Sequence, residues 1–287
     1  MPETQTQVIG EAALQYLHYA GGEPAIVLQH ATGFLPWLWH PIARELAGAH
    51  RVIAPYFCDH RETDLEKGGL HWMTLAEDLA GLCRHLQLEV PILVGHSMGA
   101  TVMTMAEAVY GIGAAGLILI EPIFFPEDYY RGGEDVEDFP MVSKSLRRRN
   151  QWQDAAEVKA YLRTKELFAN WEEEFLDLYV EHGTVKRKDF GLELSCSPQK
   201  EAAIFMGGIA YNPWPLLPRV GCPVWVLEGA QSDTGRVINF AEIATRFKNG
   251  RHLCIPGAGH LIPMEKPKET LEIISDFVES VIDRKGP

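Results

Sequence analysis

Cysteine is the first residue type that the sequence has little of. Five cysteines are scattered over 287 residues, and none forms a Cys-x-x-Cys pair. An odd, scattered set excludes the disulfide framework of a small secreted protein and favours a reducing compartment with free thiols. The sequence also has no Cys/His cluster and no two histidines four residues apart on a helix. We therefore expect no bound metal ion.

Basic charge and long apolar runs are scarce as well. The chain has 26 Lys and Arg against 39 Asp and Glu, which gives a net charge of −13 with neutral histidines. Such a field repels polyanions, so we expect neither nucleic acid nor an anionic membrane surface as a partner. No apolar run reaches the roughly 20 residues of a membrane span without a charge or a glycine. Residues 1–7 show no signal-peptide pattern. We expect a cytoplasmic protein whose partner is a small-molecule substrate, and no pattern indicates its oligomeric state.

Short apolar runs bounded by turn residues are what the sequence does contain. With 46% hydrophobic residues, a chain of this length can bury a full core without a disulfide or metal. Helical patterns separate the runs, which implies right-handed crossovers and a mostly parallel sheet of the α/β class. The predicted strands cover residues 25–29, 51–54, 91–94, 116–120, 223–227 and 252–255.

Two helices of this core have recognisable signals. Thr74 as N-cap and Glu77 at the third helical position form a capping box, which predicts a helix start. Residues 268–283 show helical periodicity, with Phe277 and Ile282 on the apolar side. We expect this second segment to be the closing helix of the core.

The strand-and-helix alternation stops after residue 121. Residues 122–215 are charged, with amphipathic helices expected over 154–170 and 171–182 and a further helix starting at Ser197-Pro198. No buried strand is evident in this stretch. The predicted domains are a core of residues 1–121 and 216–287 and a helical lid insertion of residues 122–215.

A candidate nucleophile lies directly after the third predicted strand. Gly95-His96-Ser97-Met98-Gly99 fits G-x-S-x-G and stands between that strand and a helix expected over 100–108. The sharp turn holds the serine in a strained conformation, and its flanking glycines avoid backbone clashes. A helix N-terminus at the same place favours a developing anion. We therefore predict that Ser97 is the nucleophile.

A serine needs a base, and the base needs an orienting acid. His260 follows the last predicted strand, and loops at the carboxyl ends of parallel strands share one edge of the sheet, so His260 can meet Ser97. Asp233 follows the strand before it and is the predicted acid, in the chain order Ser, Asp, His. Glu228 and Glu121, each at a predicted strand end, remain alternatives.

The oxyanion of an acyl transfer needs two backbone N–H donors. The N–H of Met98, directly after the nucleophile, is one candidate. The second is expected from the loop after the first predicted strand, from Thr32 or, as the alternative, Ala31. His30 in that loop is interpreted as structural, and His96 as a packing or pocket-wall residue.

In combination, these motifs resemble the α/β-hydrolase superfamily. The resemblance covers residues 1–121 and 216–287 and implies an eight-stranded, mostly parallel sheet, no cofactor, and acyl transfer to water through an acyl-serine. A serine at position 97 argues against the related haloalkane dehalogenase and epoxide hydrolase branches, which use an aspartate. The motifs are His30-Ala31-Thr32-Gly33 with Trp39, Gly95 to Gly99, the loop Gly229 to Asp233, and Gly257-Ala258-Gly259-His260.

Two segments depart from the pattern of many members. His30-Ala31 stands where His-Gly is common, which leaves the oxyanion geometry open. The loop from Tyr56 to Arg61 replaces Asp-x-x-Gly-x-Gly, and because this loop borders the pocket in relatives, an unusual substrate shape is expected.

The function predicted from these residues is hydrolysis of a carboxylic ester, with thioester or amide as lesser options. Hydrolysis of a C–C bond in a diketone, a cofactor-free perhydrolase, and a non-catalytic receptor on the same fold remain alternatives. Apolar pocket residues favour an apolar acyl or aryl group, although plain core is the other interpretation of them. The predicted pocket residues are Phe34, Trp37, His96, Phe124, Phe125 and Leu261.

Overall fold

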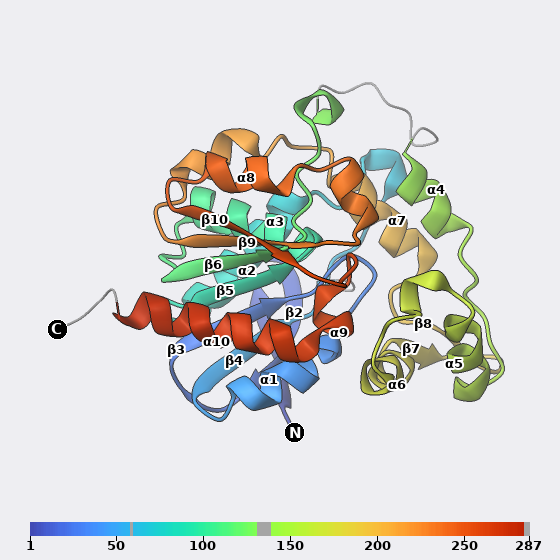
Figure 1. The fold of residues 1–287 in the computed structure, drawn as a ribbon. Helices are drawn as coiled ribbons and strands as arrows, with labels where there is room; N and C mark the ends of the chain where they lie inside the picture. The colour runs from blue at the N-terminus through green and yellow to red at the C-terminus, as the bar shows by residue number, and fades with distance from the viewer. Residues whose placement is uncertain (58–59, 131–138, 284–287) are drawn as a thin grey trace.

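A twisted eight-stranded sheet forms the centre of the molecule in the computed structural model, which describes residues 1–57, 60–130 and 139–283 (Figure 1). Six neighbouring strands run parallel, in the order β4-β3-β5-β6-β9-β10, and the N-terminal hairpin β1-β2 adds two antiparallel strands at one edge. The strands are β1 (Glu3–Ile9), β2 (Ala12–Tyr19), β3 (Gly22–Gln29), β4 (His50–Pro55), β5 (Ile92–His96), β6 (Gly116–Ile120), β9 (Val224–Gly229) and β10 (Gly250–Ile255).

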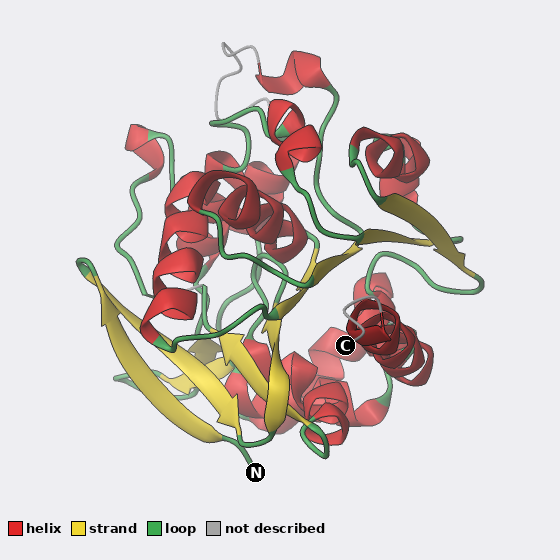
Figure 2. Cartoon of the chain, turned by 90° about the vertical axis from the view of Figure 1, so that its left-hand side faces the viewer, coloured by secondary structure: helices red, strands yellow, loops and turns green. Residues whose placement is uncertain are grey.

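Helices cover both faces of this sheet, as Figures 1 and 2 show. Alternate strand residues point to opposite faces, so Val94 and Ile118 pack with α1 and α10, while Leu93 and Leu117 pack with α2, α3 and α8. Burying both faces explains why the strands are continuous apolar runs. The helices are α1 (His40–Leu46), α2 (Trp72–His85), α3 (Met98–Met105), α8 (Phe240–Arg246), α9 (Ile262–Glu265) and α10 (Pro267–Asp283).

The chain between β6 and β9 contributes no strand to the main sheet in its described part. We call residues 122–215 the insertion; residues 131–138 within it lie outside the described residues. Its elements lie beside the core, at the right of Figure 1. They are α4 (Pro140–Leu146), α5 (Ala155–Arg163), α6 (Glu173–His182), β7 (Thr184–Lys186), β8 (Leu192–Leu194) and α7 (Pro198–Gly207).

Most predicted elements are confirmed, with four differences. The N-terminal hairpin and the small antiparallel pair β7-β8 were not predicted, although β2 buries Ala12, Leu14 and Tyr16 in alternation. Helix α2 begins at Trp72 with His71 as N-cap, so the predicted capping box at Thr74 is wrong. Ile282 is 46% exposed, and Val278 and Val281 take its expected place on the buried side of α10. Within the described part of the chain, no helix is both long and apolar enough to span a bilayer.

Candidate active site

Ser97 occupies a sharp turn between β5 and α3, as the motif predicts. Its backbone has φ 55° and ψ −118°, a strained conformation for a residue other than glycine. A Cβ at Gly95 would lie 2.5 Å from Ala100, and one at Gly99 would lie 2.6 Å from the carbonyl oxygen of Gln29, so both positions require glycine. The N–H of Ser97 donates to Ile120 of β6 at 2.8 Å, which ties the turn to the neighbouring strand.

Glu121 follows Ile120 and is fully buried beside this turn. It also has a positive φ, 49°, so two strained residues stand at the ends of the adjacent strands β5 and β6. Its Oε1 accepts the N–H of Gly229 at 2.6 Å, and its Oε2 accepts the hydroxyl of Ser232 at 2.7 Å. The same Oε2 lies 3.0 Å from Nδ1 of His260. Glu121 therefore has a hydrogen-bond partner on each of its carboxylate oxygens.

Asp233 does not contact His260, and the expectation that it orients this histidine is corrected. Its side chain is 83% exposed and pairs with Arg236 at 3.0 Å on the short helical turn Asp233–Arg236. Asp233 serves the local turn there, whereas the carboxylate that meets His260 comes from the neighbouring strand β6. Glu228, the other alternative, pairs with His252 at 2.8 Å.

The loop carrying His260 is held at three points. Glu265 of α9 accepts the N–H of Gly259 at 2.6 Å and the N–H of Leu261 at 3.3 Å, on either side of the histidine. Nε2 of His96 donates to the carbonyl oxygen of His260 at 2.9 Å. No sequence pattern predicted that Glu265, five positions after His260, would hold this loop.

These contacts select the tautomer of the neutral His260 ring. A carboxylate only accepts hydrogen bonds, so Nδ1 carries the proton that Glu121 receives and Nε2 carries the lone pair. The hydroxyl of Thr234, 3.2 Å from Nδ1, can accept a share of the same proton. This tautomer is the one in which Nε2 can act as a base.

The loop after β3 forms a tight turn from Ala31 to Phe34. The N–H of Phe34 donates to the carbonyl of Ala31 at 3.1 Å, and Gly33 has φ 76°, which is the third position of a type II turn. The N–H of Thr32 takes no part in this turn hydrogen bond. The N–H of Met98 stands at the first position of α3, where a helix leaves its N–H groups unpaired.

His30 and His96 are buried and neutral. Nδ1 of His30 donates to Ala31 at 2.8 Å, while its Nε2 accepts the N–H of Phe57 at 3.0 Å, so both ring nitrogens serve the backbone. Burial lowers the pKa of His30 to about 4 and that of His96 to about 3. Both rings act structurally in this arrangement, as expected for His30.

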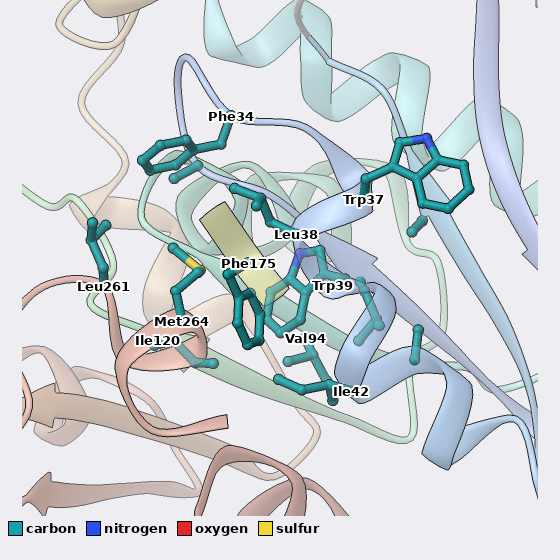
Figure 3. Close-up of a cluster of buried hydrophobic side chains, with 14 of the residues drawn as sticks. Phe34, Trp37, Leu38, Trp39, Ile42, Val94, Ile120, Phe175, Leu261 and Met264 are labelled. Carbon is teal, nitrogen blue, oxygen red and sulfur yellow. The ribbon is translucent and has the colours of Figure 1, made fainter. Parts of the chain in front are cut away.

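Some of the predicted pocket residues gather on one side of the site. Figure 3 shows Phe34 and Leu261 near Met264 and Phe175, and all four belong to one buried cluster. Beside His30, His96 and Phe34 is a cavity of about 10 Å³, room for one water at most. Ser97 itself is only 7% exposed.

The other predicted pocket residues have different neighbours. Trp37 belongs to the same buried cluster and stacks on His182 of the insertion, with ring centroids 3.8 Å apart. Phe124 belongs to the cluster on the opposite face of the sheet and packs on Trp214, while Phe125 is partly buried and packs against the same cluster. For Phe124, the plain-core interpretation describes the structure.

Two further segments bear on the expectations for the site. In the loop from Tyr56 to Arg61, residues 58–59 lie outside the described residues, while His60 and Arg61 both bind the buried carboxylate of Asp78. Residues 111–116 spell G-x-G-x-x-G, a pattern that the expectation of no cofactor did not take into account. The last of these residues, Gly116, is the first residue of β6, whereas the dinucleotide motif follows a strand and opens a helix.

Comparison with known proteins agrees with this architecture. The sequence model of the alpha/beta hydrolase family matches residues 26–273. A 2-(acetamidomethylene)succinate hydrolase from Mesorhizobium japonicum is 24% identical over 260 residues, covering 91% of this chain and 90% of that protein.

Solved structures show the same fold. That of E-2-(acetamidomethylene)succinate hydrolase has a TM-score of 0.83 at 22% identity, covering 97% of this chain and 100% of the other. A thermophilic esterase from Thermogutta terrifontis has a TM-score of 0.71 at 23% identity, covering 98% and 99%. With a family match over most of its length and the eight-stranded sheet in place, the chain belongs to the alpha/beta hydrolase family.

Proposed function

We propose that this protein is a serine hydrolase that cleaves a carboxylic ester through an acyl-serine intermediate. The observation that carries the proposal is the buried carboxylate of Glu121, 3.0 Å from Nδ1 of His260 and one residue after the strand position that holds the Ser97 turn. A buried carboxylate, an oriented imidazole and a strained serine are the three parts of an activated nucleophile.

Each residue has a definite task in this reaction. Nε2 of His260 takes the proton from Ser97 as its oxygen attacks the carbonyl carbon, and Glu121 stabilises the resulting imidazolium. The N–H groups of Met98 and Thr32 receive the negative oxygen. His260 then gives its proton to the leaving alcohol, and water repeats the sequence to release the acid and restore Ser97.

The proposed substrate carries an apolar acyl or aryl group. Phe34, Leu261, Met264 and Phe175 give the space around the site an apolar character. Amide hydrolysis is the second candidate function. It is favoured by the relative named as a 2-(acetamidomethylene)succinate hydrolase, whose substrate contains an acetamido group. A lid role for the insertion and a cytoplasmic location complete the proposal.

The direct test is labelling with a fluorophosphonate probe, read by intact mass. We expect one adduct on the wild-type protein and none on Ser97→Ala, since the probe phosphonylates only an activated serine. A series of p-nitrophenyl esters of increasing acyl length would then measure the size of the pocket.

Other outcomes would redirect the proposal. An adduct that persists on Ser97→Ala would exclude Ser97 as the nucleophile. Labelling without turnover of esters or amides would favour C–C bond cleavage or perhydrolysis by the same residues. An absence of labelling, together with tight binding of a small molecule, would favour the non-catalytic receptor.

A further inference from the structure

The insertion contributes a buried carboxylate that contacts the Ala31–Phe34 turn. Glu201 lies on α7, which begins at Pro198 with the hydroxyl of Ser197 capping the N–H of Lys200. Only 8% of Glu201 is exposed, and its Oε1 occupies the space that a Cβ on Gly33 would fill. The carboxylate therefore rests on the α-carbon of the residue that follows Thr32.

An arginine of the insertion fixes this carboxylate from the other side. Arg148 donates through Nη1 to Oε1 of Glu201 at 2.7 Å and through Nη2 to the hydroxyl of Tyr179 at 2.6 Å. Burial alone would lower the pKa of Arg148, but the nearby oxygens of Tyr179 and Glu201 outweigh it and raise this pKa. The guanidinium stays ionised and gives Glu201 a single orientation.

Phe34, the residue after Gly33 in the turn, also contacts the insertion. The ring of Phe34 meets that of Tyr179 edge-on, with centroids 5.7 Å apart, and meets Trp171 at 5.5 Å. Gly33 and Phe34 thus contact three segments of the insertion through Glu201, Tyr179 and Trp171. These contacts restrict the motion of the turn.

We propose that Glu201, oriented by Arg148, is a positioning residue that holds the Ala31–Phe34 turn in the conformation that aims the N–H of Thr32 at the oxyanion. This inference rests on the proposed function, because it concerns the same reaction. A buried ion pair adds little net stability compared with apolar side chains, which leaves its shape and position as its main contribution here. The insertion is then part of the catalytic geometry as well as a cover.

Two substitutions separate shape from charge. Glu201→Asp keeps the charge but withdraws the carboxylate by one methylene from Gly33, whereas Glu201→Gln keeps the length and loses the charge. We expect Glu201→Asp to lower kcat on the order of ten-fold with KM within about three-fold, and to weaken a boronic acid inhibitor by a similar factor. Glu201→Gln keeps the contact with Gly33 but leaves the charge of Arg148 without its carboxylate, so we expect it to lower the melting temperature more than Glu201→Asp does while lowering kcat less.

The control is an ion pair that joins insertion and core without touching the turn. Arg44 of α1 pairs with Glu174 of α6 on the surface. Arg44→Met should leave kcat and inhibitor binding unchanged, since it weakens only this peripheral contact. An equal loss in Arg44→Met and Glu201→Asp would mean that general docking of the insertion matters, which would overturn the proposal.

Hydrogen–deuterium exchange gives a readout that does not depend on activity. We expect the amides of residues 31–34 to exchange faster in Glu201→Asp than in wild type, Glu201→Gln and Arg44→Met. Unchanged exchange in Glu201→Asp would overturn the positioning role. Faster exchange in a protein whose Ser97 takes no fluorophosphonate label would keep the positioning role while rejecting the proposed reaction.

Discussion

At the scale of single residues, the carboxylate that contacts His260 comes from a different strand than expected. The carboxylate of Glu121 receives hydrogen bonds from Gly229, Ser232 and His260, while that of Asp233 faces solvent. Both are acidic residues after a buried strand, so only their surroundings distinguish them. One is desolvated and oriented, and the other is neither.

The substitution pair Glu121→Gln and Asp233→Asn tests this difference. Glu121→Gln removes the charge that stabilises the imidazolium and can present an amide N–H to Nδ1, favouring the wrong tautomer. We expect kcat/KM to fall by about 10³ to 10⁴, as for other triads that lose their acid. Asp233→Asn should stay within about two-fold, measured with the same ester. A larger loss in Asp233→Asn than in Glu121→Gln would return the role to Asp233.

Sequence alone could propose Ser97 as nucleophile and His260 as base because each sits in a local pattern with its own physical requirement. The carboxylate that contacts His260 could not be chosen in this way. Glu121 meets His260 because β6 lies between β5 and β9 in the sheet, and strand order is a property of the whole fold. The prediction of the pocket residues met a similar difficulty. Phe34 and Phe124 look alike in sequence but face opposite sides of the sheet.

At the scale of elements, the short helix α9 acts as a brace for the histidine loop. Glu265 accepts from the amides of Gly259 and Leu261, so the loop has little freedom to turn His260 away from Glu121. Helix α2 shows how such contacts override local signals. The indole N–H of Trp72 donates to Ile204 at 2.8 Å, a contact that fixes the first turn of the helix ahead of the capping pattern at Thr74.

Removing the Glu265 side chain should lower activity with little change in substrate binding. Glu265→Ala leaves two loop amides without acceptors and should lower kcat on the order of ten-fold, while KM changes by less than three-fold. The neighbouring Glu269→Gln, which affects only a weak exposed pair with Lys266, is the matched control. If steady-state kinetics of the two variants are equal, the brace has no role in catalysis.

At the scale of the whole molecule, the two buried neutral histidines make stability depend on pH. An unfolded histidine has a pKa near 6.5, whereas folding lowers that of His30 to about 4 and that of His96 to about 3. Below pH 6.5 the unfolded chain therefore binds protons that the folded chain does not. The free energy of unfolding is highest above pH 6.5 and falls as the pH drops toward 4.

Denaturant titrations can measure this effect. From pH 7 to pH 5 each histidine should cost about 2 kcal/mol of unfolding free energy. His96→Asn should remove about 2 kcal/mol of the loss, and His85→Asn, at an exposed position, should leave the loss unchanged. A free energy of unfolding that stays flat between pH 7 and pH 5 would contradict the buried neutral state of both rings.

The link between β5 and β6 has a consequence for synthesis of the protein. Ser97 and Glu121 stand at the ends of adjacent strands only 24 positions apart in the chain, joined by the hydrogen bond from Ser97 to Ile120. His260 reaches them after another 139 residues. A chain emerging from the ribosome can therefore bring Ser97 and Glu121 together well before His260 exists. In the proposed reaction, the nascent protein is inactive until the last strand docks, and hydrolysis begins only with the finished molecule.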